Sequence, residues 1–204
     1  RSLKNSGKAI TNSYFYFSFS FFIFIFLICF SLIREKMRIG NLEIDLKELT
    51  SFVVKAKKNG YAGNGKKRIE PDGSKTFIFQ EGEFHYTDNY SGSYRAPGNE
   101  IVRWQIEDGQ RIWHMAYSGG IDPEFCGNEK IKEPTLIFLK EALKLVSFDH
   151  PFRGQPLHEN KDFKYSMEVA GDIRGFFGAE EIIDKGLNRI VFSQDFMGDL
   201  VIPN

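Results

Sequence analysis

Two apolar stripes at helical spacing, each followed by short aromatic-rich segments, constrain the fold of this chain most strongly. The first stripe spans residues 46–56, with a capping box at residues 45–48 and Gly60 just past its end. The second stripe spans residues 136–146, and Pro134 stands before it at a favourable first-turn position. The spacing therefore predicts one helix in each half of the chain.

The segments that follow each helix predict antiparallel strands. They are short, rich in Phe, Tyr, Ile and Val, and separated by Gly, Asn and Asp. The clearest hairpin joins Glu100–Ile106 to Gln110–Tyr117, because the intervening Asp108-Gly109 supplies the left-handed geometry of a tight turn. We expect about four strands after each helix.

The two halves of the chain also resemble each other in the order of their motifs. Phe52–Ala56 is similar to Phe138–Ala142, and Tyr61–Gly63 is similar to Phe152–Gly154. Because each half alone would leave an apolar face exposed, these similarities predict an internally duplicated α+β domain with pseudo-twofold symmetry. In this expectation each repeat is a helix plus about four antiparallel strands, both helices cover one side of the sheet, and a cleft lies along the seam.

Residues 1–36 differ from the rest of the chain in charge and composition. They carry a net charge of +4 and residues 37–204 carry −4, so the overall charge of zero is a cancellation. Tyr14–Ile33 contains no charged residue and is long enough to cross a bilayer as a helix. However, this stretch is rich in Phe rather than Leu, and Met37 is the first methionine of the chain. We interpret residues 1–36 as mistranslated upstream sequence, with a membrane anchor as the alternative.

The remaining residues, 37–204, are expected to form a single domain with repeats at about 45–121 and 134–201. A chain of this length can bury an independent core. Cys126 is the only cysteine in this part, which excludes an internal disulfide and favours the reducing cytoplasm. A membrane-anchored location follows only if residues 14–33 are genuinely translated. The slight negative charge argues against nucleic-acid binding by this chain alone.

No pattern in the chain predicts a metal or a cofactor. The four histidines are scattered and no paired thiols occur, so zinc is not expected. Gly60–Lys66 has the spacing of a phosphate-binding loop, but Lys67 stands where that motif needs a hydroxyl, and a predicted helix precedes it instead of a strand. The neighbouring basic run, which includes Lys57, is expected to be solvated at the end of the first helix.

The polar and aromatic stretch Tyr86–Arg95 is the best candidate for a ligand-binding segment. Its tyrosines offer flat apolar surfaces with hydrogen-bonding tips, and its charged residues can fix the polarity of a bound molecule. The second strand of the clearest hairpin adds further aromatic residues. The proposed ligand-binding residues are Tyr86, Asp88, Tyr90, Trp113, Tyr117 and Arg153.

Three classes of function stay open. The first is a small-ligand-binding or sensor-like module, whose ligand is unknown. The second is an enzyme, because Glu100 and Glu181 hold equivalent places in the two halves and are expected to converge, where mutual repulsion would raise one pKa for acid–base chemistry. The third is a module that binds a partner protein, which predicts an exposed apolar patch and no enclosed cavity.

Six short elements, from about residue 50 to the end, together carry a family resemblance. They are Tyr61–Gly65, Tyr86-x-Asp88-x-Tyr90, Trp113-x-Met115-x-Tyr117, Phe138–Leu143, Phe152–Gly154 and Gly171-Asp172. The chain resembles an uncharacterised bacterial and archaeal domain-of-unknown-function family, which is also found C-terminal to helix-turn-helix regulators. The resemblance implies no established activity. Since no helix-turn-helix pattern precedes residue 45, it does not imply DNA binding here.

Overall fold

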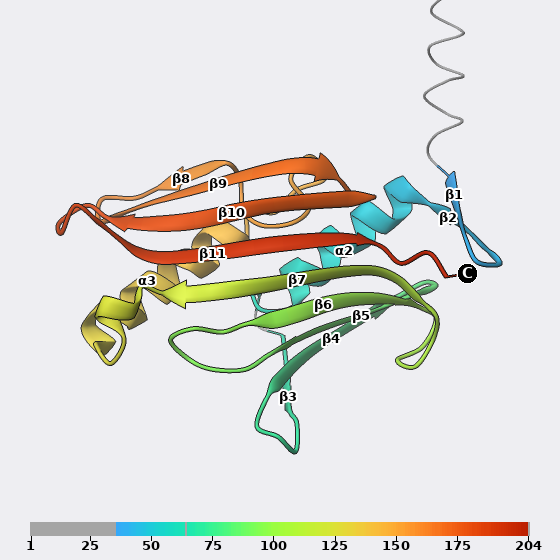
Figure 1. The fold of residues 1–204 in the computed structure, drawn as a ribbon, viewed down its shortest axis with the longest axis horizontal. Coiled ribbons are helices and arrows are strands. Elements are labelled where there is room, and N and C mark those ends of the chain that lie inside the picture. Colours follow the sequence, from blue (N-terminus) through green and yellow to red (C-terminus); the bar gives the residue numbers. More distant parts are fainter. Residues whose placement is uncertain (1–35, 64, 204) are drawn as a thin grey trace, which may run out of the picture.

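The fold is that of a computed structural model, which describes residues 36–63 and 65–203 (Figure 1). The hydrophobic stretch at residues 14–33 lies outside the described residues, so neither interpretation of it is tested. Among the helices that the structure describes, none has the length and apolar character needed to cross a membrane.

A small hairpin and a helix come first in the described chain. β1 (Lys36–Ile39) and β2 (Leu42–Asp45) form a two-stranded antiparallel sheet that leads directly into α2 (Leu46–Asn59). The Asp45 side chain caps this helix by accepting hydrogen bonds from two amides of its first turn. Helix α2 therefore begins and ends where the apolar stripe and its flanking residues predict.

Nine strands form the main sheet. In chain order they are β3 (Lys67–Ile69), β4 (Lys75–Glu81), β5 (Phe84–Tyr90), β6 (Gly98–Trp104), β7 (Arg111–Ile121), β8 (Leu157–Glu159), β9 (Phe163–Asp172), β10 (Gly175–Asp184) and β11 (Arg189–Leu200). Their order across the sheet is β3-β4-β5-β6-β7-β11-β10-β9-β8, and all neighbouring pairs are antiparallel. The strands β7 and β11 pair in the middle of the sheet, with Trp113 opposite Leu200.

The second long helix begins earlier than predicted. α3 (Glu129–Leu143) follows the short 3-10 helix η1 (Pro123–Phe125), and the Asn128 side chain caps it by accepting a hydrogen bond from a first-turn amide. Pro134 consequently lies inside α3 and not in its first turn. The prediction failed here because an interior proline removes one helical hydrogen bond and is normally a sign of a helix start.

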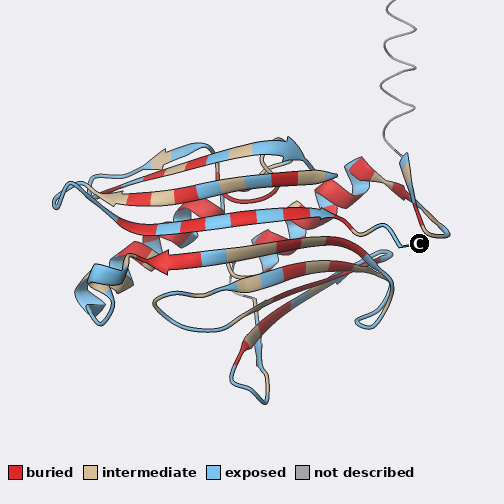
Figure 2. Cartoon of the chain, viewed as in Figure 1, coloured by how far each residue is buried: buried red, intermediate tan, exposed pale blue. Residues whose placement is uncertain are grey.

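Both helices cover the same face of the sheet (Figure 1). Helix α2 contacts β4 and β5, and α3 contacts β9 and β11. Burial alternates along the strands, and on β11 every second residue from Phe192 to Leu200 is buried (Figure 2). The core therefore lies between the helices and the sheet.

The predicted fold class is wrong. We expected an internally duplicated α+β domain, but the described residues form one large nine-stranded antiparallel sheet and a two-stranded hairpin, with α-helices of only 14 and 15 residues. Backbone pairing of β7 with β11 joins the two supposed repeats into one continuous sheet. Short alternating strands resemble one another wherever they stand, and this similarity suggested a repeat.

Candidate functional site

A cavity of about 520 Å³ lies between the two helices and the sheet. Its walls come from the two helices, the segments that follow them, the loop between β5 and β6, and the strands β4, β5, β6, β7 and β11. Five tyrosines line it, and they are Tyr61, Tyr86, Tyr90, Tyr94 and Tyr117. The cavity thus combines aromatic walls with the charged groups described below.

Most of the residues proposed as ligand-binding from the sequence line this cavity. They are Tyr86, Asp88, Tyr90, Tyr117 and Arg153. Strand alternation explains the first three, because every second residue of β5 points to the same face. The sixth, Trp113, is fully buried in the core beneath Phe176, with ring centroids 5.8 Å apart, and does not line the cavity. A binding role for these residues stays a prediction.

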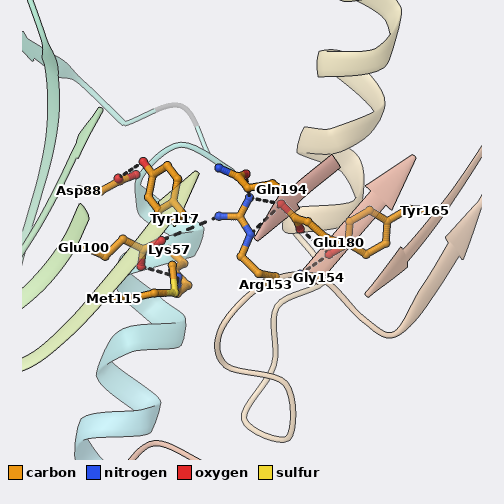
Figure 3. Close-up of polar contacts among 10 residues, drawn as sticks. All are labelled: Lys57, Asp88, Glu100, Met115, Tyr117, Arg153, Gly154, Tyr165, Glu180 and Gln194. Carbon is orange, nitrogen blue, oxygen red and sulfur yellow. Dashed lines mark hydrogen bonds and ion pairs between the residues drawn. The ribbon is translucent and has the colours of Figure 1, made fainter. Parts of the chain in front are cut away.

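A buried ion pair forms part of the cavity wall (Figure 3). Lys57, in the last turn of α2, donates a hydrogen bond to Glu100 of β6, and both side chains are less than a tenth exposed. The Lys57 Nζ atom also lies 4.0 Å from the sulfur of Met115. Burial lowers the pKa of Lys57, and the negative charge of Glu100 opposes that shift. The pair ties the end of α2 to the sheet.

Arg153 extends this ion pair into a larger cluster. Its Nε donates a hydrogen bond to Glu180 Oε1 at 3.0 Å, and its Nη2 donates one to Gln194 Oε1 at 3.1 Å. The Tyr165 hydroxyl donates to the other oxygen of Glu180 at 2.7 Å. Arg153 Nη1 lies 4.0 Å from Glu100 Oε1, which links both clusters (Figure 3). We call Lys57, Glu100, Arg153 and Glu180 the buried charge network.

The structure does not bring Glu100 and Glu181 together. Glu180, the neighbour of Glu181 on β10, occupies the buried charge network. Since successive side chains of a strand point to opposite faces, Glu181 lies on the other side of the sheet, where it accepts a hydrogen bond from Ser166 at 3.2 Å. The sequence pointed to the neighbouring residue, and a shift of one position along a strand moves a side chain to the opposite face of the sheet.

The environment of Asp88 in the cavity wall raises the pKa of its carboxyl. It accepts a hydrogen bond of 2.6 Å from the Tyr117 hydroxyl. Burial, together with the charge of Glu100, raises the pKa of Asp88 to about 7, although the bond from Tyr117 opposes this shift. The Arg153 guanidinium lies 5.6 Å from the centre of the Tyr117 ring. Near neutral pH the Asp88 carboxyl can therefore both donate and accept a hydrogen bond.

Replacing Asp88 with asparagine should change how stability depends on pH. Because its folded-state pKa of about 7 exceeds the ordinary 3.8, the folded chain holds a proton that the unfolded chain releases. The stability from this group is complete below pH 3.8 and is lost as the pH rises to about 7. We expect the unfolding free energy of the native chain, relative to Asp88→Asn, to fall by about 1–3 kcal/mol between about pH 5 and about pH 8 in urea titrations.

A matched control for this measurement is Asp72→Asn. The pKa of Asp72 is lowered by hydrogen bonds from Ser74, so its ionised form is already favoured in the folded chain. The unfolding free energy of the native chain, relative to Asp72→Asn, should therefore show no comparable fall between about pH 5 and about pH 8. If the difference in unfolding free energy between the native chain and Asp88→Asn does not vary with pH, the raised pKa of Asp88 is contradicted.

Sequence reasoning missed Lys57, Glu180, Tyr165 and Gln194 as parts of the site. Lys57 was expected to be solvated, but it is only 8% exposed. It follows Val53 by four residues and so shares the buried stripe of α2, which was the available signal. The other three come from β9, β10 and β11, and only knowledge of which strands are neighbours could have joined them.

Other chemical candidates find little support. In the described ranges, no group of three or more His, Cys, Asp or Glu residues is arranged to hold a metal ion. Cys126 is exposed and carries a free thiol in the turn between η1 and α3. The candidate chemistry of this chain therefore centres on the cavity.

Comparison with known proteins identifies a family without assigned activity. A family model described as "Domain of unknown function (DUF5680)" matches residues 88–201, which is more than half of the chain. The matched range begins at Asp88 within β5 and includes β6 to β11 and α3, while α2 lies before it. No curated protein and no solved structure matches the chain.

Proposed function

The chain belongs to the family described as domain of unknown function (DUF5680), and we propose that it binds a small molecule in the cavity between its helices and its sheet. The observation that carries this proposal is the cavity of about 520 Å³, lined by five tyrosines and the buried Lys57–Glu100 pair. Small-molecule sites are commonly about 300–1,000 Å³, with aromatic walls and a few convergent polar groups.

The buried charge network supports a sensor-like role. Lys57 belongs to α2 and Arg153 to the segment after α3, and both approach Glu100 of β6. A ligand that took one of these partners would change how these two parts of the chain are held on the sheet. The resemblance to a bacterial and archaeal domain found after helix-turn-helix regulators also supports this role. The free thiol of Cys126 supports a cytoplasmic location.

Filling the cavity from the loop between β5 and β6 should abolish ligand binding without unfolding the domain. Ala96 lines the cavity from the loop between β5 and β6 and is only partly buried, so that loop can carry a tryptophan. In a thermal-shift screen of a fragment library, we expect hits that raise the Tm of the native chain and leave that of Ala96→Trp unchanged.

The control for this screen is Ser91→Trp. Ser91 is exposed on the same loop and does not line the cavity, so this variant should keep all the hits. The proposal fails if no fragment stabilises the native chain, or if the hits stabilise Ala96→Trp equally.

Acid–base catalysis is the second candidate function, and the Asp88–Tyr117 contact favours it. A carboxyl that faces a cavity and titrates near neutrality suits proton transfer, whereas Glu181, expected from the sequence to share this role, lies on the other face of the sheet. NMR titration of the carboxyl carbon should give an Asp88 pKa of about 7. An ordinary value would remove this candidate.

A further inference from the structure

The cations that line the cavity fall into two groups. Lys57, Lys132 and Arg153 each form an ion pair with a carboxylate. Lys75 and Lys140 also line the cavity, but neither forms an ion pair within the part of the chain that the structure describes. Two positive charges at the cavity therefore lack a counter-charge from the described residues.

Each of these two lysines lies over a tyrosine ring. Lys140 Nζ is 5.0 Å from the ring centre of Tyr61, and Lys75 Nζ is 5.4 Å from that of Tyr90. The two tyrosines meet edge to face, with ring centroids 6.1 Å apart. The four side chains, which come from α3, the loop after α2, β5 and β4, thus form a continuous group. We call it the Lys–Tyr rim.

We propose that the ligand of this cavity is an aromatic monoanion. Its single carboxylate or sulfonate group would lie at the Lys–Tyr rim, and its flat uncharged body would lie among the tyrosines. Lys75 and Lys140 gain the counter-charge that the described chain does not give them. This inference deepens the proposed function and rests on it.

The same contacts argue against other classes of ligand. An organic cation would need free tyrosine faces. Four of the five lining rings already lie within 5.6 Å of a lysine or arginine of the chain itself, namely those of Tyr61, Tyr90, Tyr94 and Tyr117. A dianion with a charge at each end would place its second charge near Asp88 and Glu100, the carboxylates of the inner wall. A ligand with one anionic end and an uncharged body fits both the lysines of the rim and the carboxylates of the inner wall.

Two fluorescent dyes test the inference directly. 1-Anilinonaphthalene-8-sulfonate carries one sulfonate, and N-phenyl-1-naphthylamine has the same ring system without it, so only the charge differs. In the variant Lys75→Gln/Lys140→Gln, we expect the Kd of the sulfonate dye to rise by about tenfold, since two partly exposed charges are lost. The Kd of the neutral dye should stay within about twofold, because its ring contacts are largely kept.

Lys144→Gln is the matched control for charge. Lys144 caps the same helix, is exposed and does not line the cavity, so its replacement should leave the Kd of both dyes unchanged. Salt at about 0.5 M should weaken binding of the sulfonate dye alone.

Two results would overturn the inference. If the double lysine variant weakens both dyes equally, or neither, the anion is not recognised at the rim, yet small-molecule binding in the cavity still stands. If Ala96→Trp binds the sulfonate dye as tightly as the native chain does, the anion is held outside the cavity. Failure of the proposed function itself is distinct, because then no fragment binds the native chain in the thermal-shift screen.

Discussion

Glu180→Ala is expected to lower the unfolding free energy by about 3–5 kcal/mol, because it leaves the Arg153 guanidinium buried without its main counter-charge. The Glu180 side chain is 0% exposed and that of Arg153 is 9% exposed, so the guanidinium is largely withdrawn from bulk water and depends on this carboxylate. Tyr165 also loses the acceptor of its hydroxyl. Urea denaturation followed by tryptophan fluorescence measures this loss.

The adjacent residue supplies the control. Glu181→Ala removes a carboxylate of equal size from the other face of the sheet, where it is only partly buried, and should cost less than about 1 kcal/mol. Arg153→Met combined with Glu180→Leu should recover most of the stability, since it removes both members of this ion pair and leaves the Lys57–Glu100 pair in place. Equal small losses from Glu180→Ala and Glu181→Ala would show that the buried charge network does not hold Arg153 as described.

Local features of the fold were predictable because their signals lie close together in the sequence. The start of α2 follows from the capping Asp45, and its end from Gly60. Strand β6 begins and ends two residues before the expected strand. Strand β7 begins one residue after the expected start and continues as far as Ile121. These features depend on neighbours within a few residues, where periodicity and helix capping apply. The expected turn geometry was wrong, because the left-handed residue between β6 and β7 is Gln105, with a φ of 63°, and not Asp108 or Gly109.

The sheet as a whole was not predictable in the same way. Each strand shows alternation, but alternation does not say which strand is its neighbour. The pairing of β7 with β11 joins residues about 80 positions apart in sequence, with Trp113–Ile121 opposite Phe192–Leu200. The similarity of local motifs therefore predicted two modules, whereas the described chain forms one large sheet.

The candidate site shows the same division. Tyr86, Asp88 and Tyr90 line one wall of the cavity together because all three lie on one strand. The carboxylate of the partner strand was misplaced by one residue, from Glu180 to Glu181, because only the register across the sheet decides which face it takes. Which residues share a face of one strand could be predicted from the sequence, whereas contacts between distant strands could not.

Trp113→Ala is expected to cost about 3–5 kcal/mol of unfolding free energy, although the sequence placed this residue in the ligand site. The side chain is 0% exposed, and its ring stacks on Phe176, which in turn stacks on Phe152 at 3.7 Å. Its removal leaves a hole in the middle of the sheet's covered face, where surrounding strands are fixed by backbone pairing. Urea unfolding followed by circular dichroism measures the loss.

Two further variants separate core packing from a role in the site. Trp113→Phe keeps a ring against Phe176 and removes an indole nitrogen that has no hydrogen-bond partner among the described residues, so it should cost clearly less than Trp113→Ala. Tyr90→Ala, at a partly exposed cavity wall, should cost about 1 kcal/mol while weakening fragment binding. If Trp113→Ala instead folds with native stability and loses fragment binding, Trp113 belongs to the ligand site after all. We expect the opposite, because Tyr90 lines the cavity and Trp113 does not, although both side chains lie on the same face of the sheet.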